Sequence, residues 1–564
     1  QKTLPGIKEV RDRIPDLGTR NQRYSLITMS YKPQNSLLTF PIIIVTINTM
    51  SYQINQKIGN HVYVYEVECY WDPHKKQPRQ RRKYLGKKDP VTGQVSTPRK
   101  GFTPRMARDY GHIYLLGRLA ERIGLPEELK AAFPEIYEEL YLLSLYQILE
   151  AKPLYLFKPW AEMTYLEDPL GLSSQKISRL VEEVGTREDL RDRFFHSWVK
   201  RQGDIRAIIF DITSLSSYSR LIEYLERDYN RDRDRLPQIN LGVVLGQPSQ
   251  LPIAYRIYPG SISDVTTLRN LLILLDDLGV REFTFILDRG FYSAANIAAM
   301  SAEKIRFLLP LSFSTRVATQ LISHYHRELQ SPLHAFYYKR RPMFHVRHEI
   351  TVSEVSVAAH LFHDEKRKAD EVEHLMRQIV EVESRVEKKE FWQKEAVQEY
   401  LEQSFRGSSK LFDVTGTAPR FSLKRKPKSI SRLMNRMGKT VLLTNDPALG
   451  REDILNLYRS KDAVEKLFDV IKNELDTDRL RVSSKEAMEG RIFLTFLSLI
   501  LHSEVSRVMK EKDLYKTYTL SEVFFELKKL RLVTLTNGRS YLTEVSKKQR
   551  DLFDKFDVPV PVAA

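Results

Sequence analysis

Two aspartates follow apolar stretches that are typical of buried strands. Asp211 ends "AIIFD" and Asp288 ends "FTFILD", and small or turn-forming residues come next, in "DITS" and "DRGFYS". An ionised carboxylate beside a buried strand costs free energy unless a partner compensates its charge. A cation compensates it well, and carboxylate oxygens are ligands that suit Mg²⁺. A single aspartate of this kind is commonly a cap or a turn residue, but two in one sheet favour a metal site.

The stretch "YRSKDAVEKLFDVIK", residues 458–472, supplies a third carboxylate, Glu465. At about 100° per residue, a helix places Tyr458, Lys461, Glu465 and Lys472 in a stripe roughly 60° wide. One explanation is a surface face, because Lys461 and Glu465 have the spacing of an i,i+4 ion pair. The other is that Glu465 turns inward to complete a metal site while the lysines face a phosphate backbone. Arg289, next to Asp288, either contacts phosphate as well or balances charge.

The segment 205–312 contains the strands that position the two aspartates. Its apolar runs are bounded by turn residues, as buried strands are; they are "IRAIIFD", "QINLGVVLG", "LPIAYRIYPG", "FTFILD" and "IRFLLPL". Helical patterns precede and follow the fourth run. This order predicts a mixed α/β sheet with helices packed on it. A further strand pattern, "KTVLLTND", precedes the helix of Glu465.

The remaining segments surround this predicted core. Residues 313–438 interrupt the strand rhythm with a long charged helical stretch and a basic loop, which predicts an insertion domain. Residues 439–511 then complete the core, and residues 512–564 form a C-terminal region. Residues 101–204 have helical patterns with serine caps and glycine stops. This helical region either binds DNA, as helix-turn-helix proteins do, or is a packing bundle.

A basic hairpin is predicted within residues 50–100. "HVYVYEVECYW" alternates as a strand does, and "RQRRKYL" returns after a turn. The basic residues that we expect to contact phosphates are Lys75, Lys76, Arg79, Arg81, Arg82 and Lys83. A solvated surface is the plainer explanation of such a run. The formal net charge of +17 adds modest support for a polyanionic partner such as nucleic acid.

Composition limits the remaining classes. Cys69 is the one cysteine, which excludes a disulfide framework or a thiolate zinc site within one chain and fits a reducing cytosol. The apolar run 37–47 is too short to span a bilayer, which needs about 20 residues, so we expect no membrane partner. The sequence begins with Gln1, and strand patterning starts only after Met50. We therefore expect residues 1–49 to be an upstream extension without a role in function.

The stretch 458–472 resembles the YREK signature, Y-x2-R-x3-E-x6-K, of DDE transposases of prokaryotic insertion sequences, the insertion-sequence-four type. Tyr458, Glu465 and Lys472 fit the spacing, whereas Lys461 stands at the arginine position. Arg459 is out of register. "IIFDITS" and "FILDRGFYS" look like the two aspartate motifs of that family, and "PGSISDVTTL" and "VLLTND" resemble other segments of it.

The resemblance implies an RNase H-like catalytic domain with a β-rich insertion before the glutamate helix. It implies that Asp211, Asp288 and Glu465 are catalytic and hold two Mg²⁺ ions, with Mn²⁺ as a substitute. Tyr458, Lys461 and Lys472 are then expected to bind phosphates near the cut, although lysine at 461 cannot make a bidentate contact. The expected partner is double-stranded DNA, bound by a homodimer in the cytoplasm of a prokaryote, at the nucleoid.

The expected activity is cut-and-paste transposition. Such an enzyme binds the terminal inverted repeats of its element, cuts the ends and joins each 3′-OH to target DNA. The main alternative is a related RNase H-like nuclease, or a domesticated DNA-binding protein that no longer transposes. A second alternative is a basic structural protein in which the aspartates at the strand ends are only caps.

Overall fold

The computed structural model describes residues 50–562 except 73–74, 76, 97–102, 167–170, 218, 220–221, 223–224, 227–236, 261–263 and 476–478. The expected extension 1–49 and Lys76 therefore lie outside the described residues. The chain forms two compact units, residues 1–103 and 104–564.

The first unit contains an antiparallel sheet in the order β1-β2-β3-β4. Its strands are β1 Met50–Ile58, β2 His61–Asp72, β3 Gln77–Lys88 and β4 Val95–Ser96. The predicted hairpin is β2–β3, and it is confirmed. Strand β1 lies outside the predicted hairpin, although "MSYQINQKI" also alternates as a strand does, and it pairs with β2 along its whole length. Val64 and Val67 are the buried apolar side chains among the described residues of this sheet.

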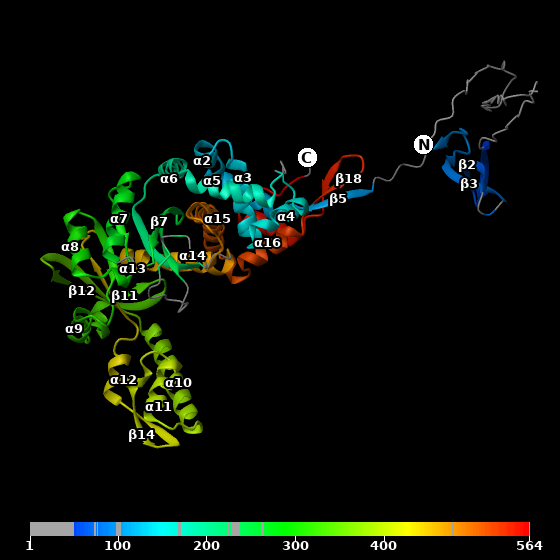
Figure 1. The fold of residues 1–564 in the computed structure, drawn as a ribbon. Coiled ribbons are helices and arrows are strands. Elements are labelled where there is room, and N and C mark those ends of the chain that lie inside the picture. The colour runs from blue at the N-terminus through cyan, green and yellow to red at the C-terminus, as the bar shows by residue number, and fades with distance from the viewer. Residues whose placement is uncertain are drawn as a thin grey trace, which may run out of the picture. The chain divides into compact units, whose positions relative to one another are not determined.

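The second unit is built on a mixed sheet in the order β11-β12-β13-β16-β10-β9-β6-β7-β8, with β17 paired to β6 (Figure 1). The strands predicted from the sequence are β6 Ala207–Ser217, β7 Gln238–Gln247, β8 Pro252–Pro259, β9 Thr284–Ile286, β10 Arg306–Pro310 and β16 Lys439–Thr444. Helices α7 Asp264–Asp277 and α8 Ala294–Ala302 flank β9 in the chain. The order of strands and helices in 205–312 matches the prediction, and β9 pairs in parallel with both β6 and β10.

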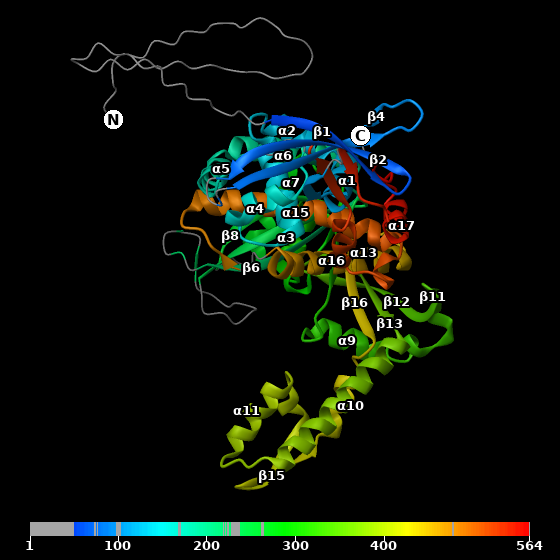
Figure 2. The same cartoon turned by 90° about the vertical axis from the view of Figure 1, so that its right-hand side faces the viewer.

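The predicted insertion 313–438 does not fold as one body. Strands β11 Ala335–Tyr338, β12 Arg341–Val352 and β13 Val355–His363 extend the main sheet, because β13 pairs with β16. The remainder packs around a separate apolar core that includes Ile379, Val386 and Leu401. It consists of α10 Glu365–Lys388, α11 Lys394–Ser404, the hairpin β14 Phe412–Thr417 and β15 Arg420–Arg425, and α12 Pro427–Met434 (Figures 1 and 2). We call 365–438 the inserted subdomain. It is mainly helical, so the expectation of a β-rich insertion is wrong for this part.

The predicted helical region 101–204 contains six helices among the described residues. They are α1 Gly111–Ile123, α2 Leu125–Ala132, α3 Tyr137–Glu150, α4 Phe157–Met163, α5 Ser174–Thr186 and α6 Glu188–Gln202. The expected signals mark their ends. Gly124 ends α1 in a left-handed conformation, and the Ser173 side chain caps α5 by accepting a hydrogen bond from the Lys176 amide.

Helix α15, Lys485–Glu511, runs through the centre of this region. It packs against α1, α3, α5 and β8. It is long and apolar enough to cross a membrane, with a mean hydropathy of 1.4, but 89% of that apolar window is buried inside the protein. The sequence interpretation overlooked this second apolar run. Its burial against other helices accounts for its composition.

Two glycines let α15 approach α5 closely. A Cβ at Gly490 would lie 1.8 Å from the Val181 carbonyl oxygen, and a Cβ at Gly185 would lie 1.8 Å from that of Glu486. Arg191 on α6 closes the end of α5, since its guanidinium donates to the Val184 and Gly185 carbonyls and contacts Glu489. The close packing of α15 against α5 therefore depends on backbone contacts rather than on side-chain contacts.

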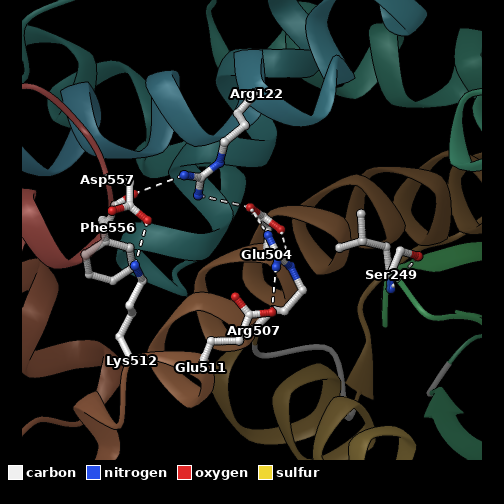
Figure 3. Close-up of polar contacts among 9 residues, drawn as sticks. Arg122, Ser249, Glu504, Arg507, Glu511, Lys512, Phe556 and Asp557 are labelled. Atoms are coloured by element: carbon white, nitrogen blue, oxygen red, sulfur yellow. Dashed lines mark hydrogen bonds and ion pairs between the residues drawn. The ribbon is translucent and has the colours of Figure 1, made fainter.

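A buried carboxylate ties the C-terminal region to the helical region (Figure 3). Glu504 on α15 is 1% exposed and accepts hydrogen bonds from Arg122 of α1, at 3.1 Å, and from Arg507, at 2.8 and 2.9 Å. Arg122 also donates to the Phe556 carbonyl at 3.0 Å, just after α17 Lys547–Lys555. These bonds compensate the charge of Glu504, which burial would otherwise penalise.

Candidate active site

Strand register brings the two aspartates together. Ile209 of β6 is paired with Ile286 of β9 in parallel. Asp211 and Asp288 each come two residues later, so they lie at the same level on the same face of neighbouring strands. The structure differs from the prediction in one respect, because β6 does not end at Asp211 but continues to Ser217 alongside β7.

Asp211 and Asp288 have different surroundings. The side chain of Asp211 is buried, and one carboxylate oxygen accepts a hydrogen bond from the Ile212 amide at 2.9 Å. Asp288 follows the short strand β9 in an extended conformation and begins a single turn of 3₁₀ helix. Its side chain is 20% exposed. The turn places Arg289 beside it at the surface.

A cavity of about 1000 Å³ opens over these aspartates. Asp211, Asp288 and Arg289 line one part of it, and the glutamate helix lines another. All seven residues of the second unit that the sequence singles out lie on its wall: Asp211, Asp288, Arg289, Tyr458, Lys461, Glu465 and Lys472. Acidic and basic side chains from segments far apart in the chain thus line the same cavity.

The glutamate helix is not one continuous α-helix. Helix α13, Arg451–Ser460, ends before Lys461, and α14, Asp462–Asp469, follows it and passes into a π-helical turn at Val470–Glu474. At the first junction the Lys461 amide bonds the Tyr458 carbonyl, a tight i→i+3 contact. At the second, the Leu475 amide bonds the Val470 carbonyl across a wider turn. Tyr458, Lys461, Glu465 and Lys472 still face the same cavity.

Lys461 forms an ion pair with Asp288 inside the cavity. Its Nζ donates to Oδ1 of Asp288, and it lies 3.8 Å from Oε1 of Glu465. The lysine side chain is 9% exposed, whereas Glu465 is 66% exposed. Burial alone would raise the pKa of Asp288, but the hydrogen bond and charge of Lys461 outweigh it, so this pKa lies below its ordinary value. Glu465 thus forms the expected i,i+4 pair and also lines the cavity, and its role as a metal ligand stays a prediction.

The carboxylates have the right chemistry for a divalent cation, but they are not gathered around one. Among the described residues, no group of three His, Cys, Asp or Glu side chains is close enough to hold a metal ion as it stands. Lys461 contacts two of the three expected ligands. A cation at Asp288 would be repelled by the lysine ammonium bonded to Oδ1, and its binding would be easier if that ammonium moved away.

The cavity also contains charged residues that the sequence interpretation missed. They are Arg367 on α10, Lys439 on β16 and Asp469 on α14. Asp469 follows Glu465 by four residues on the same helical face, a spacing that could have drawn attention to it. Nothing in the sequence near Arg367 or Lys439 pointed to the cavity. Desolvation, with the nearby charge of Lys368, lowers the pKa of Lys439 to about 8.

Tyr458 lies half-buried among these charges. Burial raises the pKa of its phenol, and the positive charges of Lys461 and Arg367 only partly oppose this effect. The hydroxyl therefore stays protonated near neutral pH. A neutral tyrosine can donate a hydrogen bond to an anion in the cavity.

The basic residues of the first unit are exposed but do not share one face. Lys75, Arg79, Arg81, Arg82 and Lys83 are all exposed, and Lys76 lies outside the described residues. Residues directly opposite each other in an antiparallel pair share a face. Arg81 and Lys83 lie opposite Glu68 and Glu66, whereas Arg82 lies opposite the buried Val67. The hairpin thus presents bases on both faces, and three of them have acidic neighbours, because Arg79 also lies 3.5 Å from Asp72.

Two neighbouring aromatic residues of the inserted subdomain differ in exposure. Phe391 is 5% exposed and belongs to the apolar core of the subdomain, which favours a packing role. Trp392 is 75% exposed at the turn between α10 and α11.

Comparison with known proteins identifies the family. Residues 202–501 match the family described as "Transposase DDE domain", which is more than half of the chain. Domains of this family generally use divalent metal ions. No curated protein sequence matches the chain. A cryo-EM structure of a piggyBac transposase synaptic complex with hairpin DNA is similar over 80% of this chain and 83% of that one, with 11% identity and a TM-score of 0.30. A similarity this low carries no argument about function.

Proposed function

Because this chain belongs to the transposase DDE domain family, we propose that it is a DNA transposase of a prokaryotic insertion sequence of the YREK group. It binds the terminal inverted repeats of its element, cuts the element ends and joins the freed 3′-OH groups to target DNA. The alternative is an RNase H-like nuclease, or a domesticated DNA-binding protein without transposition.

One observation carries the proposal: three carboxylates from separate segments line one cavity together with several bases. Asp211 comes from β6, Asp288 from the end of β9 and Glu465 from α14. Phosphodiester transfer needs little covalent help from a protein, and mostly needs positioning and charge neutralisation. A cavity lined by both acidic and basic side chains can supply this positioning and this charge neutralisation.

The residues have complementary roles in this proposal. Asp211, Asp288 and Glu465 are the catalytic ligands of two Mg²⁺ ions, or of Mn²⁺ in their place. When bound, such a pair of ions would activate the attacking oxygen and stabilise the leaving one. Tyr458 and Lys472 position the phosphates beside the cut, and Arg289 neutralises phosphate charge next to Asp288. Lys461 joins them once its ammonium has left Asp288.

The domains divide the remaining tasks. The hairpin unit 50–100 contacts DNA phosphates, through Lys75, Lys76, Arg79, Arg81, Arg82 and Lys83. The helical region 101–204 adds further DNA contacts, and residues 205–312 with 439–511 form the catalytic core. The enzyme works as a homodimer on double-stranded DNA, at the nucleoid in the cytoplasm of a prokaryotic cell. Residues 512–564 brace the helical region, which the hydrogen bond from Arg122 to the Phe556 carbonyl supports.

An end-joining assay tests the proposal. The substrate is a labelled duplex taken from the DNA that flanks the gene, and the target is a supercoiled plasmid, with Mg²⁺ present. We expect the label to appear in plasmid DNA when the duplex contains an inverted repeat, and not with a scrambled duplex of equal length. Cutting without joining would favour the nuclease, and binding without cutting would favour the domesticated protein.

A further inference from the structure

We propose that Arg367 of the inserted subdomain is a phosphate-binding residue of the catalytic cavity. This inference rests on the proposed function and adds to it a residue that lies outside every recognised motif. Arg367 lies in the first turn of α10 and lines the cavity together with Tyr458 and Lys461.

Two hydrogen bonds fix the direction of the Arg367 guanidinium. Nε donates to Oε1 of Glu371, one turn further along α10, at 2.7 Å, and Nη1 donates to Oγ1 of Thr440 on β16 at 3.0 Å. The side chain is nevertheless 50% exposed. Within the described part of the chain, Nη2 makes no recorded hydrogen bond. A guanidinium carries five N–H donors in a rigid fork, so donors remain for an anion in the cavity.

Arg367 is held at the junction where the inserted subdomain joins the main sheet. The Asp364 amide bonds the Gly438 carbonyl at 2.9 Å, which joins the entry and the exit of the subdomain. Glu371 strengthens this junction, because its second oxygen accepts a hydrogen bond from the Gly438 amide at 2.8 Å. Gly438 has a φ of +70°, and a Cβ there would lie 2.5 Å from the Asp364 carbonyl oxygen. Because Arg367 is hydrogen-bonded to this junction, its guanidinium is held in place before any ligand binds.

The basic residues at and near the arginine position of the signature are occupied or point elsewhere. Lys461, at the signature's arginine position, is paired with Asp288. The guanidinium of Arg459 stacks over the ring of Tyr338 at 4.5 Å, and Arg459 does not line the cavity. Arg289 and Arg367 are therefore the two guanidinium groups on the cavity wall among the described residues.

The sheet places Arg367 at some distance from the cut. Its partner Thr440 is on β16, and β10 separates β16 from β9, the strand that leads to Asp288. Two strand spacings amount to about 10 Å. Successive phosphates of one DNA strand advance by about 3.4 Å along the helix axis. Arg367 is thus suited to a phosphate a few nucleotides from the cut rather than to the scissile one.

DNA affinity measured without metal tests this inference. The probe is a 40-base-pair duplex from the flanking DNA, in EDTA, titrated at several salt concentrations. We expect Arg367→Gln to weaken binding by about 10-fold, the effect of losing hydrogen bonds to a charged group. The slope of log affinity against log salt should fall by about 0.9. Arg367→Lys keeps the charge and should keep the slope while losing part of the affinity.

A matched control separates this role from a structural one. Arg377, on the same helix, also makes an i,i+4 ion pair, with Glu373 four residues before it at 2.6 Å, and does not line the cavity. Arg377→Gln should leave affinity and slope unchanged. If Arg367→Gln lowers only the melting temperature and Arg367→Lys binds DNA with wild-type affinity, Arg367 merely braces the junction and the inference is wrong. A wild-type protein that fails to bind any duplex would instead refute the proposed function.

Discussion

Replacing Lys461 with methionine should lower the free energy of unfolding, because the largely buried Asp288 carboxylate would lose its positively charged partner. Methionine keeps most of the apolar stem and removes the charge. The lysine is 9% exposed and Asp288 20% exposed, so their pair is largely buried. Removing one partner of a buried pair typically costs about 3–5 kcal/mol. Since Asp288 also borders an open cavity, we expect about 3 kcal/mol at pH 7, the lower end of that range.

The i,i+4 pair with Glu465 adds little to this cost. Glu465 is 66% exposed, and exposed helix pairs contribute about 0.3–0.5 kcal/mol. The two interpretations of Lys461 therefore differ by several-fold in the free energy of unfolding. Urea denaturation of the wild type, Lys461→Met and Lys461→Arg measures this difference, and Lys461→Arg should retain most of the stability because it keeps the charge.

The pH dependence gives a second test with a definite sign. In the wild type, Lys461 holds the pKa of Asp288 below its ordinary value. The pair therefore contributes stability at pH values above the unfolded-state pKa, and this contribution is lost as the pH falls through the folded-state pKa. In Lys461→Met, burial without the lysine should raise the pKa of Asp288. Asp288 is then protonated at a higher pH in the variant, so the difference in unfolding free energy should narrow on acidification from pH 7.

A double-mutant cycle assigns the effect to the right partner. With Asp288→Asn already present, Lys461→Met should cost little. A Lys461→Met protein that is within about 0.5 kcal/mol of wild type at pH 7, with no dependence on pH, would match only an exposed helix pair. That result would refute the pairing with Asp288.

Three further predictions concern the metal ligands, the hairpin and the helix crossing. Without DNA, Lys461→Met should bind Mn²⁺ more tightly than the wild type by calorimetry, because the ammonium no longer competes for Asp288; weaker binding would show that the lysine supports the site instead. The slope of log affinity for DNA against log salt should fall by up to about 5 when the six basic residues of the hairpin are neutralised, namely Lys75, Lys76, Arg79, Arg81, Arg82 and Lys83. The fall should be smaller if Glu66 and Glu68 already neutralise Lys83 and Arg81. An unchanged slope would show that the hairpin does not contact DNA. Gly490→Ala should destabilise the protein in urea by about 3 kcal/mol or more, because its Cβ would meet a carbonyl oxygen at 1.8 Å, whereas Gly117→Ala, whose nearest neighbour is 3.8 Å away, should not.

The sequence was informative where local pattern and chemistry agree. The short apolar runs before Asp211 and Asp288, bounded by turn residues, are typical of buried strands, and the structure pairs these two strands side by side. The spacing from Tyr458 to Lys472 identifies residues that face one cavity, even though the helix is broken at Lys461. Such features depend on residues close together in the chain.

The missed features depend on tertiary pairing. Strands β12 and β13 look like part of an insertion because their patterns are short and mixed, and only their pairing with β16 assigns them to the main sheet. The contact of Lys461 with Asp288 joins residues 173 positions apart. Arg367 reaches the cavity because α10 starts beside β16, which no local pattern reveals. The position of the Glu465 carboxylate likewise depends on a turn at Lys461 that helical periodicity does not predict.

The most direct test of the account is the cutting of an element-end duplex by Asp211→Ala in single-turnover conditions with Mg²⁺. Asp211 is buried and lines the cavity, and in the proposed function it is a ligand of the catalytic ions rather than a DNA contact. We predict that this variant binds the duplex with near wild-type affinity but does not cut it. A control, Asp276→Ala, removes a 74%-exposed carboxylate that does not line the cavity and should cut normally. If Asp211→Ala cuts at the wild-type rate, the cavity is not the catalytic site.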